Sequence, residues 1–290
     1  MTTAEYRFRV AGFTFVAALP SAVGIDALLP SFRPFRESGD TEGEDIFRFS
    51  TAERLPHVAR TLLEETDNDM GHLHLFSTEA GYRVELLHDG HTHVMHVDSS
   101  FSAAEAQISW QDKKAGDAVS SMLRIAYSQA VILRDAVSIH AAAVCTGGRA
   151  YLFMGKSGTG KSTHAALWIK HIPGTQLLND DNPTVRLIDG RAYACGTPWS
   201  GKTPCYRQLT FPIGGMVRLS QASENRFLPL EGADAFIAVY PGCSVISQDD
   251  RLCNMLYDTL ATLAETVPTG ALRCRPDREA ALLCHDSLIK

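Results

Sequence analysis

Eight consecutive residues have the types and spacing of a phosphate-binding loop. They match G-x-x-x-x-G-K-[ST] and are Gly155, Lys156, Ser157, Gly158, Thr159, Gly160, Lys161 and Ser162. In this motif the glycines let backbone N–H groups point at phosphate oxygens, and the following helix adds its positive N-terminal dipole. We expect Lys161 to reach the β- and γ-phosphates and the Ser162 hydroxyl to bind Mg²⁺. The sequence therefore predicts a nucleoside triphosphate site, with ATP and Mg²⁺ as cofactors.

The segments around the loop predict the elements that must hold it. Tyr151-Leu-Phe-Met154 indicates a strand before the loop. The residues from Thr163 to Lys170 indicate a helix after it, which stops at Pro173-Gly174. This order of strand, loop and helix favours a phosphate-binding loop over a chance glycine-rich turn. Thr163, which directly follows the motif, is also predicted to bind the nucleotide.

Two adjacent carboxylates follow the next predicted strand. Leu177-Leu178 indicates a buried strand that ends in Asn179, Asp180 and Asp181, so the aspartates would face the loop. One carboxylate would hold Mg²⁺, and the other could accept the proton of an attacking hydroxyl. The alternative is an Asx-type turn that caps the strand before Pro183.

Two further groups could complete this site. His140 lies on a strand that the Gly147-Gly148 turn would fold back beside the loop's own strand, where a metal or phosphate contact is as well supported as a hydrogen-bonded core histidine. The segment Gly196–Lys202, with Trp199 and Lys202, fits together with the nearby Arg207 a lid that stacks on a base or grips phosphate. A rigid loop is the other interpretation of that segment.

Length and composition limit the class of protein. A chain of 290 residues fits one large domain or two smaller ones. Its hydrophobic content of 45% is ordinary, and no apolar run approaches the ~20 residues of a membrane helix, so we expect a soluble protein. No secretory signal is evident, so we expect it in the cytoplasm. A net charge of -6 argues against nucleic acid and anionic membranes as partners. The seven cysteines contain no C-x-x-C pair and are expected to be reduced thiols.

The N-terminal part, residues 1–115, is predicted to be a β-rich module, and residues 116–290 a catalytic domain with C-terminal helices. Predicted strands include Tyr6–Ala17, Ile46–Phe49 and His72–Ser77, followed by a hairpin over 81–97. Its turn is Asp89-Gly90, and a second hairpin is predicted around Asp189-Gly190. Helices are predicted from an N-cap at Asp117 to Leu133, from Ser247 and from Pro276. Six histidines gather near the first hairpin, where a solvated polar face is favoured over zinc: His72, His74, His88, His91, His93 and His96.

Residues 136–210 resemble the HPr kinase/phosphorylase-like kinases, which are structurally related to ATP-dependent phosphoenolpyruvate carboxykinase. The resemblance rests on His140, on the loop in its G-x-S-G-x-G-K-[ST] form and on Asp180-Asp181. It implies an α/β (α+β) fold with a P-loop kinase core and a mixed sheet. It also implies that His140 lies near the phosphates or metal, that Lys161 binds phosphate, and that Ser162 and the aspartates provide Mg²⁺ binding and acid/base catalysis. Which aspartate has which role is open.

These observations predict a kinase that transfers the γ-phosphoryl of ATP to a hydroxyl of a small molecule or of a peptide or protein serine, in a chain that could form a homo-oligomer. Thr163 stands where HPr kinases have Glu, so HPr itself is not carried over as substrate. The segments 196–202 and 267–288 resemble uncharacterised HPr-kinase-like proteins of bacteria, which implies a bacterial origin. A carboxykinase-like enzyme and a non-catalytic nucleotide sensor are the alternatives.

Overall fold

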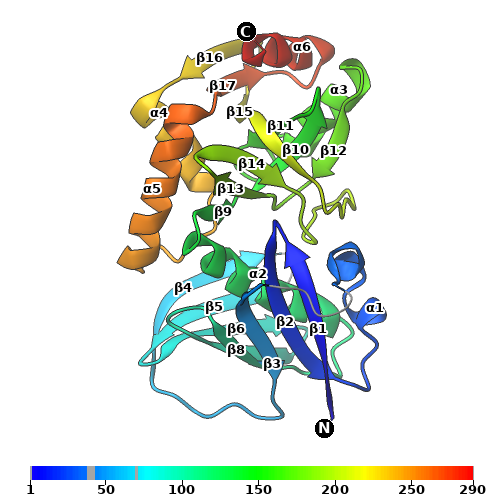
Figure 1. Cartoon of the computed structure of the whole chain (residues 1–290), viewed down its shortest axis with the longest axis vertical. Coiled ribbons are helices and arrows are strands. Elements are labelled where there is room, and N and C mark those ends of the chain that lie inside the picture. The colour runs from blue at the N-terminus through cyan, green and yellow to red at the C-terminus, as the bar shows by residue number, and fades with distance from the viewer. Residues whose placement is uncertain (1, 38–42, 69–70, 290) are drawn as a thin grey trace. The chain divides into compact units, whose positions relative to one another are not determined.

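The chain forms two compact units, Met1–Val131 and Ile132–Lys290, each built on one β-sheet. The computed structural model describes residues 2–37, 43–68 and 71–289. Each sheet contains both parallel and antiparallel neighbours, and helices accompany both (Figure 1). The predicted mixed α/β class is therefore confirmed. Within the described residues, no helix is long and apolar enough to cross a membrane.

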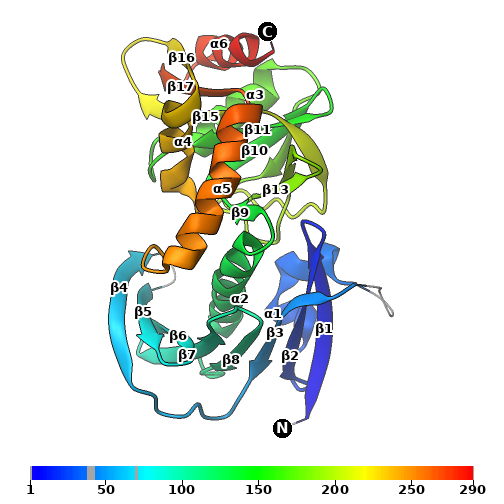
Figure 2. The ribbon, with the colours of Figure 1, turned by 60° about the vertical axis from the view of Figure 1, so that its left-hand side comes forward.

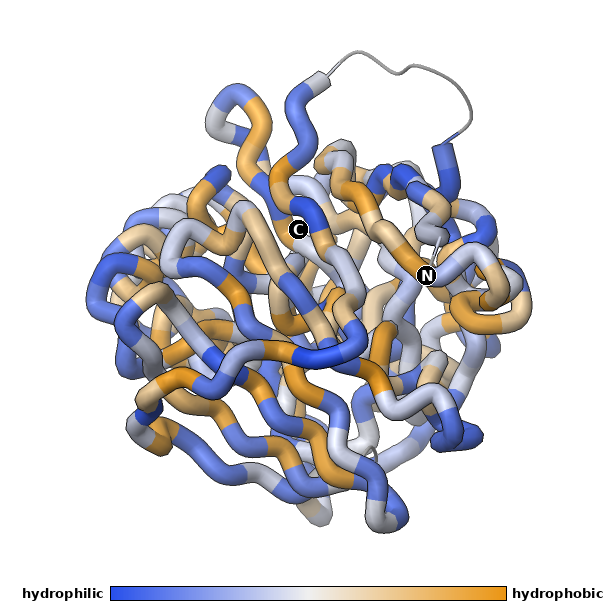
Figure 3. Tube along the Cα trace, turned by 90° about the horizontal axis from the view of Figure 1, so that it is seen from below, coloured by the Kyte–Doolittle hydropathy of each residue, from blue (hydrophilic) through white to orange (hydrophobic). Residues whose placement is uncertain are grey.

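The first unit is an eight-stranded sheet with the order β1-β2-β3-β8-β7-β6-β5-β4. Polar and apolar residues alternate along several of its strands (Figure 3), as expected for strands that bury one face, whereas β2 is buried along its whole length. Two short helices, α1 (Ile25–Leu28) and the 3₁₀ helix η1 (Pro30–Phe35), follow the first hairpin. The strands are β1 (Thr3–Val10), β2 (Phe13–Pro20), β3 (Asp45–Thr51), β4 (Arg60–Asn68), β5 (Gly71–Thr78), β6 (Gly81–His88), β7 (His91–Asp98) and β8 (Ala103–Gln107).

Tight turns explain which hairpins the sequence revealed. Asp89 and Gly90 both have positive φ, 45° and 77°, which is the type I′ geometry that Asp-Gly favours, and the predicted hairpin is confirmed. The predicted single strand Tyr6–Ala17 is wrong, because β1 and β2 are joined by a turn at Ala11-Gly12 with φ of 51° and 82°. Alanine rarely adopts positive φ, so Ala11-Gly12 does not match the residue pairs that predict a tight turn.

A long helix, α2 (Ala115–Ile132), packs inside the curve of the first sheet (Figure 2). Its Tyr127 ring lies 6.1 Å from that of Phe15, and the Tyr127 hydroxyl donates to the carbonyl of Val10 at 3.4 Å. These contacts attach α2 to the first unit, whereas the sequence-based boundary after residue 115 assigned it to the second. The predicted N-cap at Asp117 is also too late in the chain, since the helix begins at Ala115 and Asp117 lies in its first turn.

The six histidines near the first predicted hairpin do not form one solvated face. His93 is 0% exposed, and its Nε2 and the Nδ1 of His88 lie 3.0 and 3.2 Å from Oδ2 of Asp112. Burial raises the pKa of Asp112, but hydrogen bonds from the Lys114 amide, His93 and His88 outweigh it and hold the pKa well below its usual range. The prediction of a solvated polar face is therefore wrong for His88 and His93. No group of three or more His, Cys, Asp or Glu side chains in the described parts of the chain is arranged to hold a metal.

The second unit contains nine strands. One path runs β12-β10-β11-β15-β14-β13-β9, and β17 pairs with β15 and in turn with β16. Strands β11, β15 and β17 are parallel, so their carboxyl ends lie at one edge of the sheet. The strands are β9 (Ala136–Ser138), β10 (Ala141–Thr146), β11 (Arg149–Met154), β12 (Gln176–Asn179), β13 (Thr184–Ile188), β14 (Arg191–Cys195), β15 (Thr210–Gln221), β16 (Arg226–Leu230) and β17 (Thr269–Cys274).

Helices α3 (Lys161–His171) and α6 (Arg278–Leu288) bury one face of this sheet in a core around Trp168, Phe153 and Leu272. Helices α4 (Gly232–Val239) and α5 (Asp250–Thr266) and the 3₁₀ helix η2 (Tyr240–Gly242) complete the unit. The predicted α3 and the Asp189-Gly190 hairpin are confirmed.

The two C-terminal helices exist as predicted but begin later in the chain. Asp249 caps α5 by accepting the amides of Arg251 and Leu252, in place of the predicted Ser247. Asp277 caps α6 by accepting the amide of Ala280, so this helix starts at Arg278 and not at Pro276. In both cases an aspartate close to the predicted start provides the N-cap.

The core of the second unit predicts how its stability depends on pH. Burial lowers the pKa of His164 to about 4, and Trp168 Nε1 donates to its unprotonated Nε2 at 3.1 Å. Below pH 6.5 the unfolded chain binds a proton that the folded chain does not, so stability falls as pH drops from 6.5 to 4, by roughly 3 kcal/mol. His164→Gln keeps an acceptor for Trp168 and removes the titration. Denaturant unfolding at several pH values should show a flatter profile for this variant, and an unchanged slope would contradict the assignment.

Candidate functional site

The glycine-rich loop connects β11 to α3 at the carboxyl edge of the sheet. Gly155, Gly158 and Gly160 all have positive φ, at 154°, 79° and 99°, which turns the backbone tightly. A Cβ on Gly155 would lie 3.1 Å from the carbonyl oxygen of Leu219 on β15, so only glycine fits there. No described group accepts a hydrogen bond from the backbone N–H of Ser157 or Ser162. Free amides around a helix N-terminus form an anion-binding arrangement.

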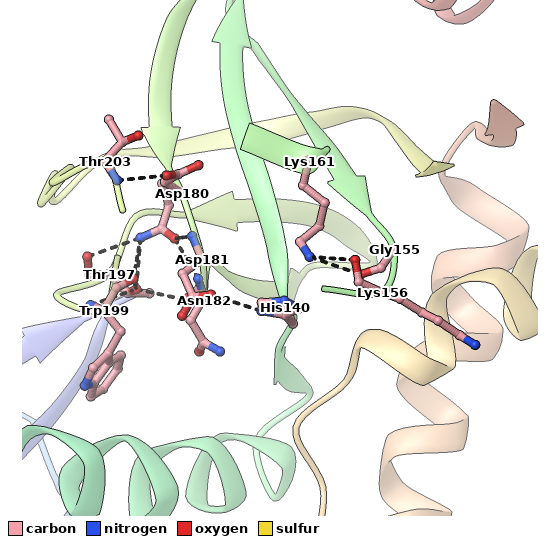
Figure 4. A network of polar contacts seen from close by, with 11 residues as sticks. His140, Gly155, Lys156, Lys161, Asp180, Asp181, Asn182, Thr197, Trp199 and Thr203 are labelled. Atoms are coloured by element: carbon pink, nitrogen blue, oxygen red, sulfur yellow. Dashed lines mark hydrogen bonds and ion pairs between the residues drawn. The ribbon is translucent and has the colours of Figure 1, made fainter. Parts of the chain in front are cut away.

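Lys161, the first residue of α3, is buried beneath this loop. Its Nζ donates to the carbonyl oxygens of Gly155 and Lys156 at 3.1 and 3.4 Å. Burial lowers the pKa of Lys161, and the charges of Asp181 and Asp180 oppose that change. The ammonium is therefore held inside the loop, on the side that faces the aspartates (Figure 4). The Lys156 side chain is exposed and points away from them.

The carboxyl end of β12 forms an Asx-type turn around the side chain of Asn179. Its Oδ1 accepts the amides of Asp181 and Asn182 at 2.9 and 2.8 Å. Its Nδ2 donates to the carbonyl oxygens of Thr197 and Trp199 at 3.3 and 3.0 Å. The turn considered as an alternative is thus present, and it is also what fixes the two aspartates. The two interpretations of this sequence are compatible.

Asp180 is 5% exposed and has an unsatisfied oxygen. Its Oδ2 accepts the amide of Thr203 at 3.1 Å, while its buried Oδ1 has no hydrogen-bond partner among the described residues. A buried carboxylate oxygen without a partner costs free energy unless a cation or a proton binds it. Mg²⁺ prefers oxygen ligands, so the unpaired carboxylate oxygen of Asp180 could serve as a Mg²⁺ ligand.

His140 lies between β9 and β10, beside the second aspartate. Its Nδ1 is 3.0 Å from Oδ1 of Asp181, and its side chain is 45% exposed. Its amide donates to the carbonyl oxygen of Gly242 at 2.7 Å, and the amide of Ala141 donates to the Asp181 carbonyl oxygen at 3.0 Å. His140 is therefore not a core histidine. The structure places an exposed histidine paired with the partly buried Asp181 at the same edge of the sheet as the glycine-rich loop.

The segment between β14 and β15 packs directly on the aspartates. A Cβ on Gly201 would lie 3.0 Å from the carbonyl oxygen of Asp180, and Trp199 is buried. Trp199 is therefore a structural anchor and is not free to stack on a base. Lys202 is exposed between Gly201 and Thr203, so its backbone lies beside Asp180.

Arg207 does not join this group. Its Nη1 donates to Oε1 of Gln176 at 2.8 Å, and Gln176 begins the strand that ends at Asn179. At about 3.3 Å per residue, that contact is roughly 10 Å from the aspartate end of β12. The prediction that Arg207 grips phosphate is therefore not supported by its position.

Sequence reasoning missed residues that position the others. Thr203 and Gly242 contribute backbone groups to Asp180 and His140, and Gln221 donates through Nε2 to the carbonyl oxygen of Gly158 at 3.1 Å. The first two act through the main chain, which leaves no trace in residue type. Gln221 is far from the loop in sequence and is brought to it only by the pairing of β15 with β11.

Comparison with known proteins identifies no family for this chain. No family model and no curated protein matches it. Among solved structures, it is similar to the HPr(Ser) kinase/phosphatase from Coxiella burnetii, at 13% sequence identity and a TM-score of 0.32, over 52% of this chain and 88% of that one. A similarity this low carries no argument about activity, so the function must be inferred from the site itself.

The hydrogen bonds of Asn179 lead to a stability prediction. Asn179→Ala removes an acceptor for two amides and a donor to two carbonyl groups in a fully buried place, and should lower the free energy of unfolding by about 3 kcal/mol. Asn179→Asp keeps the acceptor and loses the donor. Hydrogen exchange should then show faster exchange at 197–203 in both variants and at 180–182 only in the alanine variant. Equal exchange at 180–182 in the two variants would contradict the role of Oδ1.

Proposed function

We propose that this protein is an ATP- and Mg²⁺-dependent kinase that transfers the γ-phosphoryl group to a hydroxyl. The proposal depends on one observation, which is that four groups lie at the same edge of the sheet. They are a loop with free amides, a buried lysine, a buried carboxylate with an unpaired oxygen, and an exposed histidine paired with a partly buried aspartate. Phosphoryl transfer requires mainly positioning and charge stabilisation, together with a group that accepts the hydroxyl proton. These residues provide each of those parts.

The environments of the two aspartates support different roles for them. Asp180, buried with one free oxygen, would hold Mg²⁺ together with the Ser162 hydroxyl at the first turn of α3. Bound Mg²⁺ would neutralise charge on the phosphates. Asp181 is more exposed and contacts His140, so it is the group that can accept a proton from an incoming hydroxyl.

The transfer then balances as follows. The acceptor oxygen gives its proton to Asp181 and forms a bond to the γ-phosphorus. The bond from that phosphorus to the β–γ bridging oxygen breaks, and ADP leaves with the electron pair. Lys161 and the loop amides stabilise the developing charge. The acceptor, which we propose is a small molecule or a serine of a peptide or protein, must approach from the side of Asp181.

The loop is tested by binding. Lys161→Met removes the buried ammonium, and the affinity for Mg²⁺-ATP should fall by about 10-fold or more, because a charge-assisted contact to phosphate is lost. Lys170→Met, on the exposed end of the same helix, is the matched control and should leave the affinity unchanged. Calorimetric titration would measure both. Equal affinities of Lys161→Met and the unaltered protein would overturn the assignment of the loop.

Catalysis is tested by label transfer. The assay contains γ-labelled ATP, Mg²⁺ and a panel of hydroxyl acceptors, namely serine, serine peptides and a cell extract. Asp181→Asn should lower the transfer rate by about 100-fold or more, because a general base is lost, while ATP still binds. Asp189→Asn, in an exposed hairpin turn, is the control. ATP binding without transfer to any acceptor would favour a nucleotide sensor, and release of phosphoenolpyruvate from labelled ATP and oxaloacetate would favour a carboxykinase.

A further inference from the structure

Two exposed arginines face each other on the strands beyond the loop. Arg226 begins β16, and it lies directly opposite Arg273, the second-last residue of β17. The neighbouring Leu272 is fully buried in the core under α3 and α6. Because side chains alternate along a strand, the two arginines project from the other face of the sheet.

This pair of like charges is not neutralised by the described residues around it. Among the described residues, no carboxylate makes an ion pair with either guanidinium. Asp277 and Glu279, which follow β17 in the chain, bind Arg275 instead. Like charges directly opposite each other on neighbouring strands destabilise a sheet. Two facing guanidinium groups without an acidic partner among the described residues have the charge and the donors to bind an anion.

The order of the strands relates this pair to the glycine-rich loop. Across the carboxyl edge of the sheet, β12 carries the aspartates, β10 begins next to His140 and β11 leads into the loop. On the other side of the loop come β15, β17 and β16 in turn. Gln221, the last residue of β15, is hydrogen-bonded to Gly158, which fixes this side of the edge against the loop. At about 4.8 Å per strand, Arg273 stands roughly 10 Å from the strand of the loop and Arg226 roughly 14 Å.

We propose that Arg226 and Arg273 form the subsite for the nucleoside end of the bound nucleotide, contacting its α-phosphate and its base. This rests on the proposed function. The γ-phosphoryl group must face Asp180 and Asp181, so the triphosphate crosses the loop from β12 towards β15, and its nucleoside extends over β17 and β16. Guanidinium groups bind phosphate oxygens and stack on the faces of aromatic bases.

An acidic acceptor is the other ligand with matching charge, but it does not fit this position. The acceptor hydroxyl has to meet the γ-phosphorus beside Asp181, which is on the opposite side of the loop from both arginines. The exposed Lys156 points away from the aspartates (Figure 4), so it extends the positive charge on the side of the loop away from the transferred group.

The test compares nucleotide with a phosphate chain that lacks a nucleoside. In the double variant R226A/R273A, the dissociation constants of Mg²⁺-ATP and Mg²⁺-ADP should rise about 10-fold, because charge-assisted contacts are lost. Binding of Mg²⁺-tripolyphosphate, which uses only the loop, should stay within twofold of the unaltered protein. The control R149A/R191A removes two exposed arginines at the starts of β11 and β14 and should change neither affinity.

The outcomes separate this inference from the proposed function. If the unaltered protein binds neither ATP nor tripolyphosphate, the proposed function fails. If ATP binds and R226A/R273A leaves its affinity unchanged, or weakens ATP and tripolyphosphate equally, the nucleoside subsite is overturned. If only transfer to an acidic acceptor is impaired while ATP binding is unchanged, the pair serves the acceptor and the inference is wrong.

Without nucleotide, the melting temperature of R226A/R273A should be equal to or higher than that of the unaltered protein, since a like-charge pair has been removed. A lower melting temperature would indicate a structural role for the two arginines.

Discussion

The buried side-chain amide of Asn179 is the interaction on which the site depends. It accepts from two amides of the turn that carries the aspartates, and it donates to the segment that covers them. With no exposure to water, this amide has no solvent to replace a lost partner, so its hydrogen bonds determine the turn geometry. The orientation of Asp180 and the contact of Asp181 with His140 both follow from that turn.

The second constraint is the close approach of the glycine-rich loop to its neighbours. Gly155 cannot carry a side chain beside β15, and the Gln221 side chain ties the loop to the end of that strand. The loop is thereby held at the carboxyl edge of parallel strands, where ligands of open α/β sheets commonly bind. Lys161 is held inside it by two carbonyl oxygens, so the charged groups are arranged before any ligand arrives.

The parts that the sequence predicted are those determined by local residue types. The loop, the helix at Lys161 and the hairpins at Asp89-Gly90 and Asp189-Gly190 need only neighbouring residues. The parts it did not predict depend on tertiary pairing. Arg207 was predicted to bind phosphate, but in the fold its guanidinium donates to Gln176 on β12. The histidines near Asp112 were predicted to be solvated, but the fold buries His93 against that carboxylate. The helix starts were displaced for a simpler reason, because several capping residues lie close together in the sequence.

Two features that oppose stability lie at the carboxyl edge of the second sheet. The open oxygen of Asp180 is a buried acceptor without a donor, and Arg226 and Arg273 are like charges in direct opposition. They lie on opposite sides of the same loop. A chain selected only for stability would have satisfied or replaced these groups, whereas a cation at one position and an anion at the other would satisfy both. In a Mg²⁺-nucleoside triphosphate the cation could meet Asp180 and the phosphate chain could meet the arginines. The unpaired groups are therefore more consistent with one extended ligand than with two unrelated sites.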